Sequence, residues 1–243
     1  MKSQRIKILG LGLVLSVILG SGCTGYNPGE LTRLADEYGS DKGSKGHGYT
    51  EVYEHFFYPK KYEARKIFEI GVFRGASMKM FRDFFPKAII YGIDIVDTSS
   101  LDSNKMKTFI VDQANRKQLK DFIDTHGYDF DIILDDGGHS MEQQQVSFGY
   151  LFRYLKSGGY YIIEDVHTSI PEYYPGYGVE ENEENTTLVM INNFIRSGRM
   201  KSKYMTPEGK NYLTANIEYC DLLSRNSGKS VTCIFKKKDV VSE

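Results

Sequence analysis

Short apolar runs alternate with amphipathic segments from residue 66 onward. The runs that have the length of buried strands lie at 67–70, 88–93, 108–111, 130–134 and 160–163. Helical spacing of apolar residues predicts helices at 76–85, 116–125 and 141–155, the last closed by Gly158-Gly159. Such alternation is typical of parallel strands joined by crossover helices, so we predict an α/β fold with a Rossmann-like, doubly wound and mostly parallel sheet.

Further elements flank this pattern. Helical spacing recurs at 30–38, 49–58 and 187–196, and the glycine-rich stretch at 39–48 predicts a loop. Residues 215–222 and 230–236 are expected to pair as an antiparallel closing hairpin through 224–228. The turn-rich, acidic and aromatic stretch at 169–184 predicts a long insertion or lid.

The amino terminus has the residue order of a secretory signal. Basic residues precede an apolar run at 8–19, which is short for a transmembrane helix, and small residues then lead to Cys23. This order resembles a bacterial lipoprotein cleavage site, with Gly20 where that pattern usually has leucine. A membrane-associating or unstructured leader is the alternative. We therefore expect a leader at 1–25 and one domain at 26–243, with its binding core at 60–170.

Charge and cysteine content narrow the classes of function. The formal net charge of -1 gives no global basic field, so nucleic acid is not an expected partner. The cysteines, Cys23, Cys220 and Cys233, have neither metal-site nor disulfide-framework spacing. Cys220 and Cys233 lie on segments that could pair as neighbouring strands, so a bridge between them is the alternative to the free thiols that we predict.

Polar residues follow the ends of the first three predicted strands. Glycines after Glu69 would let the backbone approach a ligand, and the next helix would offer its N–H groups to a carboxylate. The turn has ExGxxxG where dinucleotide proteins have GxGxxG; an acid there opposes a pyrophosphate and favours a cationic cofactor. Acids ending the second and third strands could bind ribose and adenine. The candidate cofactor residues are Glu69, Gly71, Gly75, Ser77, Asp94, Asp112, Gln113 and Asp135.

Acidic residues and a histidine follow the fourth and fifth strands. Asp136, Glu164 and Asp165 would give an oxygen-rich shell suited to Mg²⁺, and without a cation they would repel one another. His139 follows in the same glycine loop and is the candidate general base, because an imidazole titrates near neutral pH. Tyr49 and His167 are candidate substrate contacts.

Taken in order, these motifs resemble the macrolide and sugar O-methyltransferases of the mycinamicin-biosynthesis type. The motifs are Glu69-Ile-Gly-Val, Gly92-Ile-Asp, Asp112-Gln, Asp135-Asp-Gly-Gly-His and Ile163-Glu-Asp, and the segments Leu34–Gly43 and His47–Thr50 are also similar to that family. The resemblance covers residues 31–169. The family typically has serine where this chain has Gly138, and the carboxyl-terminal third diverges.

The resemblance implies a class I S-adenosylmethionine-dependent O-methyltransferase that uses Mg²⁺ and acts on a sugar or glycosylated small molecule. It implies that Asp136, Glu164 and Asp165 bind the metal, that His139 is the base, and that the cofactor residues named above hold S-adenosylmethionine. A nicotinamide-dependent oxidoreductase and a non-catalytic cofactor-binding lipoprotein are the alternatives. The ExGxxxG turn argues against the oxidoreductase, and the presence of the full set of carboxylates and histidine argues against the non-catalytic lipoprotein.

Partners and location follow from the same features. We expect a small-molecule or glycan acceptor, with homo-oligomerisation left open. S-adenosylmethionine is made in the cytosol, which favours a cytoplasmic catalytic domain, whereas the leader suggests export or membrane association through the amino terminus.

Overall fold

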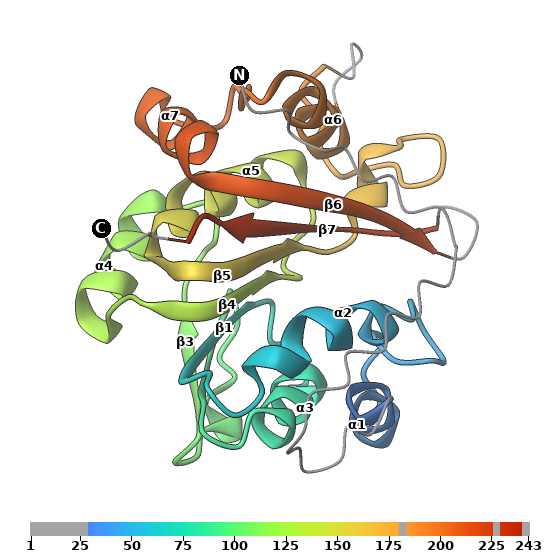
Figure 1. The fold of residues 1–243 in the computed structure, drawn as a ribbon, viewed down its shortest axis with the longest axis vertical. Coiled ribbons are helices and arrows are strands. Elements are labelled where there is room, and N and C mark those ends of the chain that lie inside the picture. The colour runs from blue at the N-terminus through green and yellow to red at the C-terminus, as the bar shows by residue number, and fades with distance from the viewer. Residues whose placement is uncertain (1–28, 180–183, 226–228, 240–243) are drawn as a thin grey trace.

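The computed structural model describes residues 29–179, 184–225 and 229–239 (Figure 1). The predicted leader at 1–25 lies outside these residues. Within them, no helix combines the length and the apolar character needed to cross a membrane.

A seven-stranded sheet forms the centre of the described chain, in the order β3-β2-β1-β4-β5-β7-β6 (Figure 1). Strands β1 to β5 run parallel, and β7 pairs antiparallel with both β5 and β6. The predicted Rossmann-like sheet with an antiparallel closing hairpin is therefore confirmed. The strands are β1 (Lys66–Ile70), β2 (Ile89–Asp94), β3 (Met106–Ile110), β4 (Phe130–Asp135), β5 (Leu155–Ile163), β6 (Ile217–Arg225) and β7 (Ser230–Lys237).

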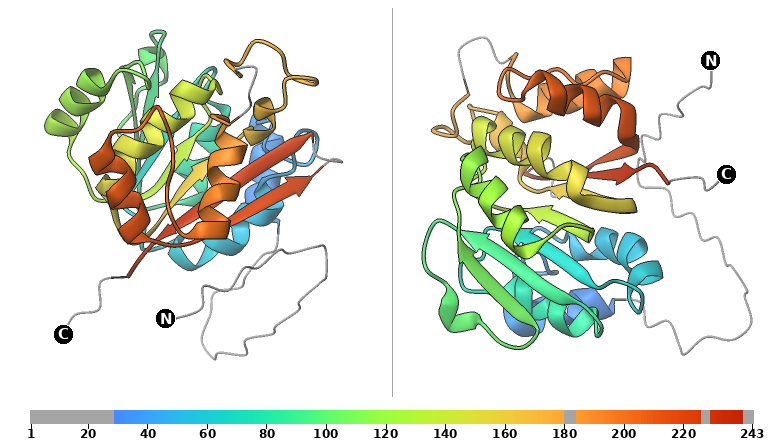
Figure 2. Two further views of the ribbon diagram at one scale, coloured as in Figure 1. Left: turned by 90° about the horizontal axis from the view of Figure 1, so that it is seen from above. Right: turned by 90° about the vertical axis from the view of Figure 1, so that its left-hand side faces the viewer.

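Helices cover both faces of the sheet (Figure 2). Alternate strand side chains point to opposite faces, so Ile67 and Ile132 enter one core and Phe68 and Ile133 the other. The first core is covered by α1 (Glu30–Tyr38), α2 (Thr50–Phe57) and α3 (Ala76–Phe84). The second is covered by α4 (Arg116–His126), α5 (Met141–Leu151), α6 (Thr187–Ser197) and α7 (Pro207–Asn216). Short 3-10 helices lie at Tyr58–Lys60, Ser99–Leu101, Phe152–Tyr154 and Val166–Ser169.

One predicted feature of the carboxyl-terminal half is wrong, and one helix there was not predicted. Gly158 and Gly159 do not close a helix but lie inside β5, where the register with β4 shifts and Gly158 has a φ of 69°. Helix α7 was not predicted, because Gly209 and Leu213 are its buried residues and give little periodic signal. Thr206, whose hydroxyl caps the helix, and the proline at its first position were the available cues.

The turns after three parallel strands are tied to one another at the carboxyl edge of the sheet. Gly71 N–H donates to Ile93 O, and Asp136 N–H donates to Ile70 O, each at 2.9 Å. Glu164 N–H donates to the carbonyl of Asp135, also at 2.9 Å. This edge is where open α/β sheets bind ligands, and these bonds hold the predicted motifs in place.

Candidate active site

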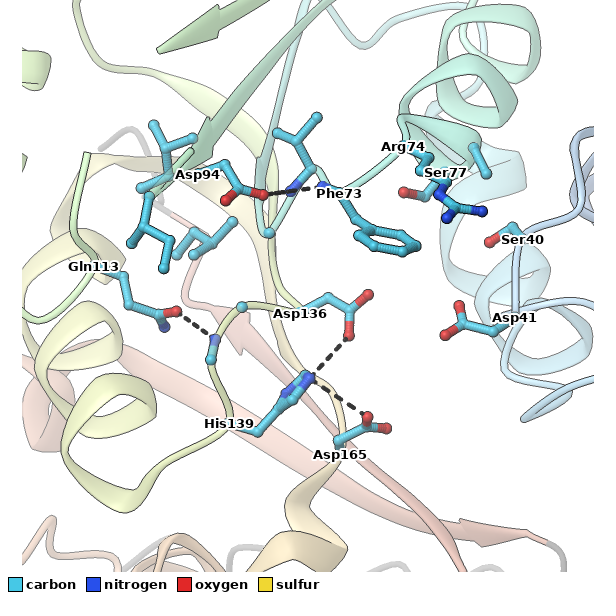
Figure 3. A pocket seen from close by; sticks show the side chains of 18 of the residues that line it. Ser40, Asp41, Phe73, Arg74, Ser77, Asp94, Gln113, Asp136, His139 and Asp165 are labelled. Carbon is cyan, nitrogen blue, oxygen red and sulfur yellow. Dashed lines mark hydrogen bonds and ion pairs between the residues drawn. The ribbon is translucent and has the colours of Figure 1, made fainter. Parts of the chain in front are cut away.

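A cavity of about 470 Å³ opens at this edge (Figure 3). Figure 3 shows Asp94 and Gln113 on the β2 and β3 side, and Ser40 and Asp41 on the opposite side. The cavity is lined by residues 39–42, 70–74, 76–77, 93–95, 111, 113, 136–139, 143 and 165.

The turn after β1 is shaped by Gly71 and Asp94. Gly71 has a φ of 88°, and a β-carbon there would overlap the carbonyl oxygen of Asp136. One carboxylate oxygen of Asp94 accepts hydrogen bonds from the N–H groups of Val72 and Phe73, both at 2.9 Å. The ring of Phe73 is 77% exposed and stands in the cavity (Figure 3). The turn therefore presents both a carboxylate and an aromatic face to a ligand.

The structure divides the predicted cofactor residues into two groups. Gly71, Ser77, Asp94 and Gln113 line the cavity. The other four do not line it: Glu69 and Asp135 are buried, Gly75 begins α3 in a left-handed conformation, and Asp112 accepts a bond from Ala114 N–H at 2.8 Å.

Asp135 lies beneath the loop at 136–139 and is linked to it by hydrogen bonds. Its carboxylate accepts hydrogen bonds from Ser147 Oγ and, at 2.9 Å, from Gln113 Nε2, whose Oε1 accepts from Gly138 N–H at 2.8 Å. Burial raises the pKa of Asp135 to about 6, although these hydrogen bonds lower it. Asp135 therefore positions the loop that carries His139, as a residue behind the cavity wall.

Glu69 is a fully buried acid near Ser77 and Lys42. It is 0% exposed, and among the described residues neither carboxylate oxygen has a hydrogen-bond partner. Burial raises its pKa to about 8, against the lowering effect of the Lys42 ammonium. A buried acid with unsatisfied oxygens, beneath a turn that faces a cavity, suits a site for a cationic ligand.

Glu69 gives a prediction about stability and pH. Because its pKa rises from 4.5 to about 8 on folding, the folded protein keeps a proton that the unfolded chain releases. Stability should therefore fall as the pH rises between these values. Glu69→Gln should be more stable than the wild type by about 3–5 kcal/mol near pH 9, and equal to it near pH 4. Urea unfolding of ligand-free protein across this range measures the difference, and parallel curves would contradict the assignment.

Asp136, His139 and Asp165 converge at the centre of the cavity (Figure 3). His139 Nε2 lies 3.9 Å from Asp136 Oδ1 and 3.7 Å from Asp165 Oδ2. His139 and Asp165 both have positive φ values, 58° and 53°, in the strained left-handed region that is often found at functional sites. One ligand atom from each of the three residues lies within 4.8 Å of the others. Two carboxylates and one imidazole fit a divalent cation.

Glu164, the other predicted metal ligand, is not part of this trio. It is 1% exposed; Oε1 accepts from Tyr53 OH at 2.8 Å, and Oε2 pairs with Lys42 Nζ at 2.9 Å. Lys42 Nζ also pairs with Asp136 Oδ2. Burial raises the pKa values of Glu164 and Asp136, and the Lys42 ammonium opposes both shifts. The structure thus gives Glu164 two close partners in place of an open coordination position.

The two predicted substrate contacts lie behind the cavity wall. Tyr49 is 0% exposed and its hydroxyl donates to Asp165 Oδ1 at 3.0 Å. His167 is 3% exposed, and its Nδ1 accepts from Val231 N–H at 3.2 Å, which fixes its tautomer. Burial lowers the pKa of His167. These contacts suit residues that orient Asp165 and its loop.

Gly138, where the family typically has serine, has a local explanation. Gln143 folds over it: its side chain accepts from Ser140 N–H at 3.2 Å, and Ser140 Oγ accepts from Gln143 N–H at 3.3 Å. A β-carbon at Gly138 would overlap the Gln143 amide. The glycine therefore makes room for the side chain that caps α5.

Sequence reasoning gave no role to Lys42, Tyr53, Ser147 or Phe73. Lys42 lies in the segment that resembles the family, and this was the one feature of the sequence that could have pointed to a role for it. Tyr53 occupies an inward position of a predicted helix, where an aromatic residue is expected for packing alone.

The chain is similar to known sugar methyltransferases. No family model matches it. L-olivosyl-oleandolide 3-O-methyltransferase of Streptomyces antibioticus is 30% identical over 218 residues, which is 85% of this chain and 55% of that protein. Mycinamicin VI 2''-O-methyltransferase of Micromonospora griseorubida is 32% identical over 185 residues, 72% of this chain and 45% of that protein. The structure of the MycE methyltransferase with Mg, SAH and mycinamycin VI matches with a TM-score of 0.71 and 27% identity, over 86% of this chain and 55% of that one.

The chain belongs to the S-adenosylmethionine-dependent methyltransferases. It is related to the macrolide sugar O-methyltransferases, which confirms the resemblance seen in its motifs. This methyltransferase spans about half the length of the relatives it matches.

Proposed function

We propose that the protein transfers a methyl group from S-adenosylmethionine to a hydroxyl of a sugar or glycosylated small molecule, with the assistance of Mg²⁺. The observation that carries the proposal is the convergence of Asp136, His139 and Asp165 in the cavity at the carboxyl edge of a methyltransferase sheet. The similarity to MycE, whose structure contains Mg, SAH and mycinamycin VI, supports the cofactor, the metal and the class of acceptor.

The cofactor would be held between the turns after β1, β2 and β3. Asp94 is placed to bind ribose hydroxyls with lone pairs not used by the turn. Gly71 gives access to the backbone of the turn, and the buried Glu69 carboxyl group lies beneath it. Gln113 and Ser77 add polar groups to the wall.

The metal would be held by Asp136, Glu164 and Asp165. Asp136 and Asp165 already face the cavity, and Tyr49 fixes the orientation of Asp165. Glu164 would have to exchange a contact with Lys42 or Tyr53 to join them. When bound, the cofactor supplies an electrophilic methyl group, and the cation lowers the pKa of a hydroxyl that it binds.

His139 is the proposed general base. Its Nε2 faces the point between Asp136 and Asp165, where an acceptor hydroxyl would be bound, so Nε2 would accept the hydroxyl proton. The two carboxylates nearby would stabilise the imidazolium that forms. The exposed ring of Phe73 and the ring of Tyr177, 6.3 Å from His139 between centroids, offer apolar faces to the acceptor.

Two measurements on the purified chain test the proposal. Calorimetric titration should show binding of S-adenosylhomocysteine and none of NAD⁺, since the ExGxxxG turn opposes a pyrophosphate. Methyl transfer from labelled S-adenosylmethionine to a panel of glycosides should require Mg²⁺ and stop in EDTA. Binding of NAD⁺ in place of S-adenosylhomocysteine, or transfer unaffected by EDTA, would overturn the cofactor or the metal part respectively.

A further inference from the structure

Lys42 is a buried lysine in the middle of the proposed metal site. Its side chain is 1% exposed, and Nζ contacts Asp136 Oδ2, Glu164 Oε2 at 2.9 Å and Asp41 Oδ1 at 3.7 Å. Burying an ammonium group is costly unless opposite charges surround it. The carboxylates therefore offset the cost of burying the Lys42 ammonium, and the ammonium in turn offsets the repulsion between the carboxylates.

The loop that carries Lys42 is firmly held. The Lys42 carbonyl accepts from Thr50 N–H at 3.0 Å and from Thr50 Oγ1 at 3.1 Å. One residue further along, a β-carbon at Gly43 would overlap the Asp36 carboxylate, which accepts from Ser44 N–H at 2.9 Å and Ser44 Oγ at 2.6 Å. The ammonium group is thus delivered by a defined backbone on a loop that packs against α1 and α2.

Lys42 also uses the oxygen that a metal would need. With Tyr53 on Oε1 and Lys42 on Oε2, each oxygen of Glu164 has a close donor. The oxygen of Asp136 that faces His139 is the other one, Oδ1. A divalent cation can therefore use Asp136 and Asp165 directly, but to use Glu164 it must displace Tyr53 from Oε1 or Lys42 from Oε2, and Lys42 is the charged competitor of the two.

We propose that Lys42 is a built-in counter-cation that a divalent metal must displace from Glu164, so that Lys42 weakens metal binding and keeps the site folded without metal. This inference rests on the proposed function, because it takes the same carboxylates as metal ligands. It explains how these buried acids coexist in a metal-free protein. The same arrangement makes the metal exchangeable, because the Lys42 ammonium can pair with Glu164 again when the metal dissociates.

The test is the affinity of the full chain for Mg²⁺, measured by calorimetric titration of metal-free protein with MgCl₂. Lys42→Met should lower the Kd for Mg²⁺ at least about tenfold, because the competing charge is gone. Lys42→Arg keeps the charge and should not tighten binding. Lys45→Met removes an exposed lysine from the same loop and should leave the Kd unchanged. Tyr53→Phe removes an uncharged donor from Glu164 and should not reproduce the tenfold effect.

The outcomes separate the two proposals. A wild type that binds Mg²⁺ while Lys42→Met binds it no tighter overturns the inference and leaves the proposed function standing. Binding by neither protein overturns the metal assignment of the proposed function, and the inference with it. Binding by Lys42→Met alone supports the inference. If Lys42→Met is unfolded without metal, recovery of its helical circular dichroism on addition of MgCl₂ supports the inference, and failure to recover contradicts it.

Discussion

Replacing His139 with alanine is expected to lower kcat for methyl transfer by about 10²- to 10⁴-fold, the usual contribution of a general base. The affinities for S-adenosylhomocysteine and Mg²⁺ should persist, because the cofactor turn lies on the other strands and the carboxylates remain. Single-turnover transfer and two calorimetric titrations measure these quantities. Restoring transfer with added imidazole would further indicate loss of a base.

Two further variants sharpen this result. His55→Ala removes an exposed histidine of α2 and should leave transfer unchanged. Asp136→Ala should abolish Mg²⁺ binding as well as transfer, because Asp136 contributes an oxygen to the cluster. If His139→Ala loses Mg²⁺ binding to the same extent as Asp136→Ala, then the imidazole is a metal ligand and not the base.

Replacing Gly71 with alanine is expected to lower the free energy of unfolding by about 2–5 kcal/mol. Left-handed backbone costs a residue with a β-carbon about 1–2 kcal/mol, and overpacking adds about 1–3 kcal/mol. Here the new methyl would meet the Asp136 carbonyl, so the strain would move both the turn after β1 and the loop that carries Asp136 and His139. S-adenosylhomocysteine binding should fall together with stability. Urea unfolding and calorimetric titration measure the two effects.

Gly29→Ala is the matched control for this substitution. Gly29 has a φ of 85°, close to the 88° of Gly71, but a β-carbon there would meet nothing within 4 Å. It should therefore show the backbone cost alone, about 1–2 kcal/mol, with cofactor binding intact. If the two variants lost the same free energy of unfolding, the contact between the turn after β1 and the Asp136 carbonyl would not contribute to stability.

The parallel part of the fold could be predicted from the sequence because its signals are local. The strands between residues 66 and 135 are short apolar runs and the helices lie between them, so their predicted bounds agree with the structure to within a few residues. Helix α7 was not predicted because it lacks such a local signal. Tertiary packing and a threonine cap stabilise a segment with little apolar character. The helix end predicted at Gly158 is wrong because a glycine that follows an apolar helix is typical of a helix end. In the structure this glycine lies where the register between β4 and β5 shifts.

The candidate site could be predicted only where its residues follow strands. Asp94, Asp136 and Asp165 lie at strand ends, and topology alone brings them to one edge. No local pattern could show that Lys42 would pair with Asp136, 94 positions away, or that Glu164 would turn toward Tyr53. Those side-chain choices depend on burial and charge compensation, which exist only in the packed structure.

The polar network behind the cavity has a consequence for how the chain folds during synthesis. Tyr53 OH contacts Thr232 Oγ1 at 2.9 Å across 179 positions of sequence, and Thr232 Oγ1 donates to Ile163 O at 3.1 Å. Strand β7, which carries Thr232, runs between β5 and β6, so neither of its neighbours is fully paired until it is inserted. The ribosome must therefore release residues 230–237 before Glu164 can be enclosed. Because β7 makes these contacts from far along the sequence, the pairing of β7 with β5 belongs to the late, non-local part of folding.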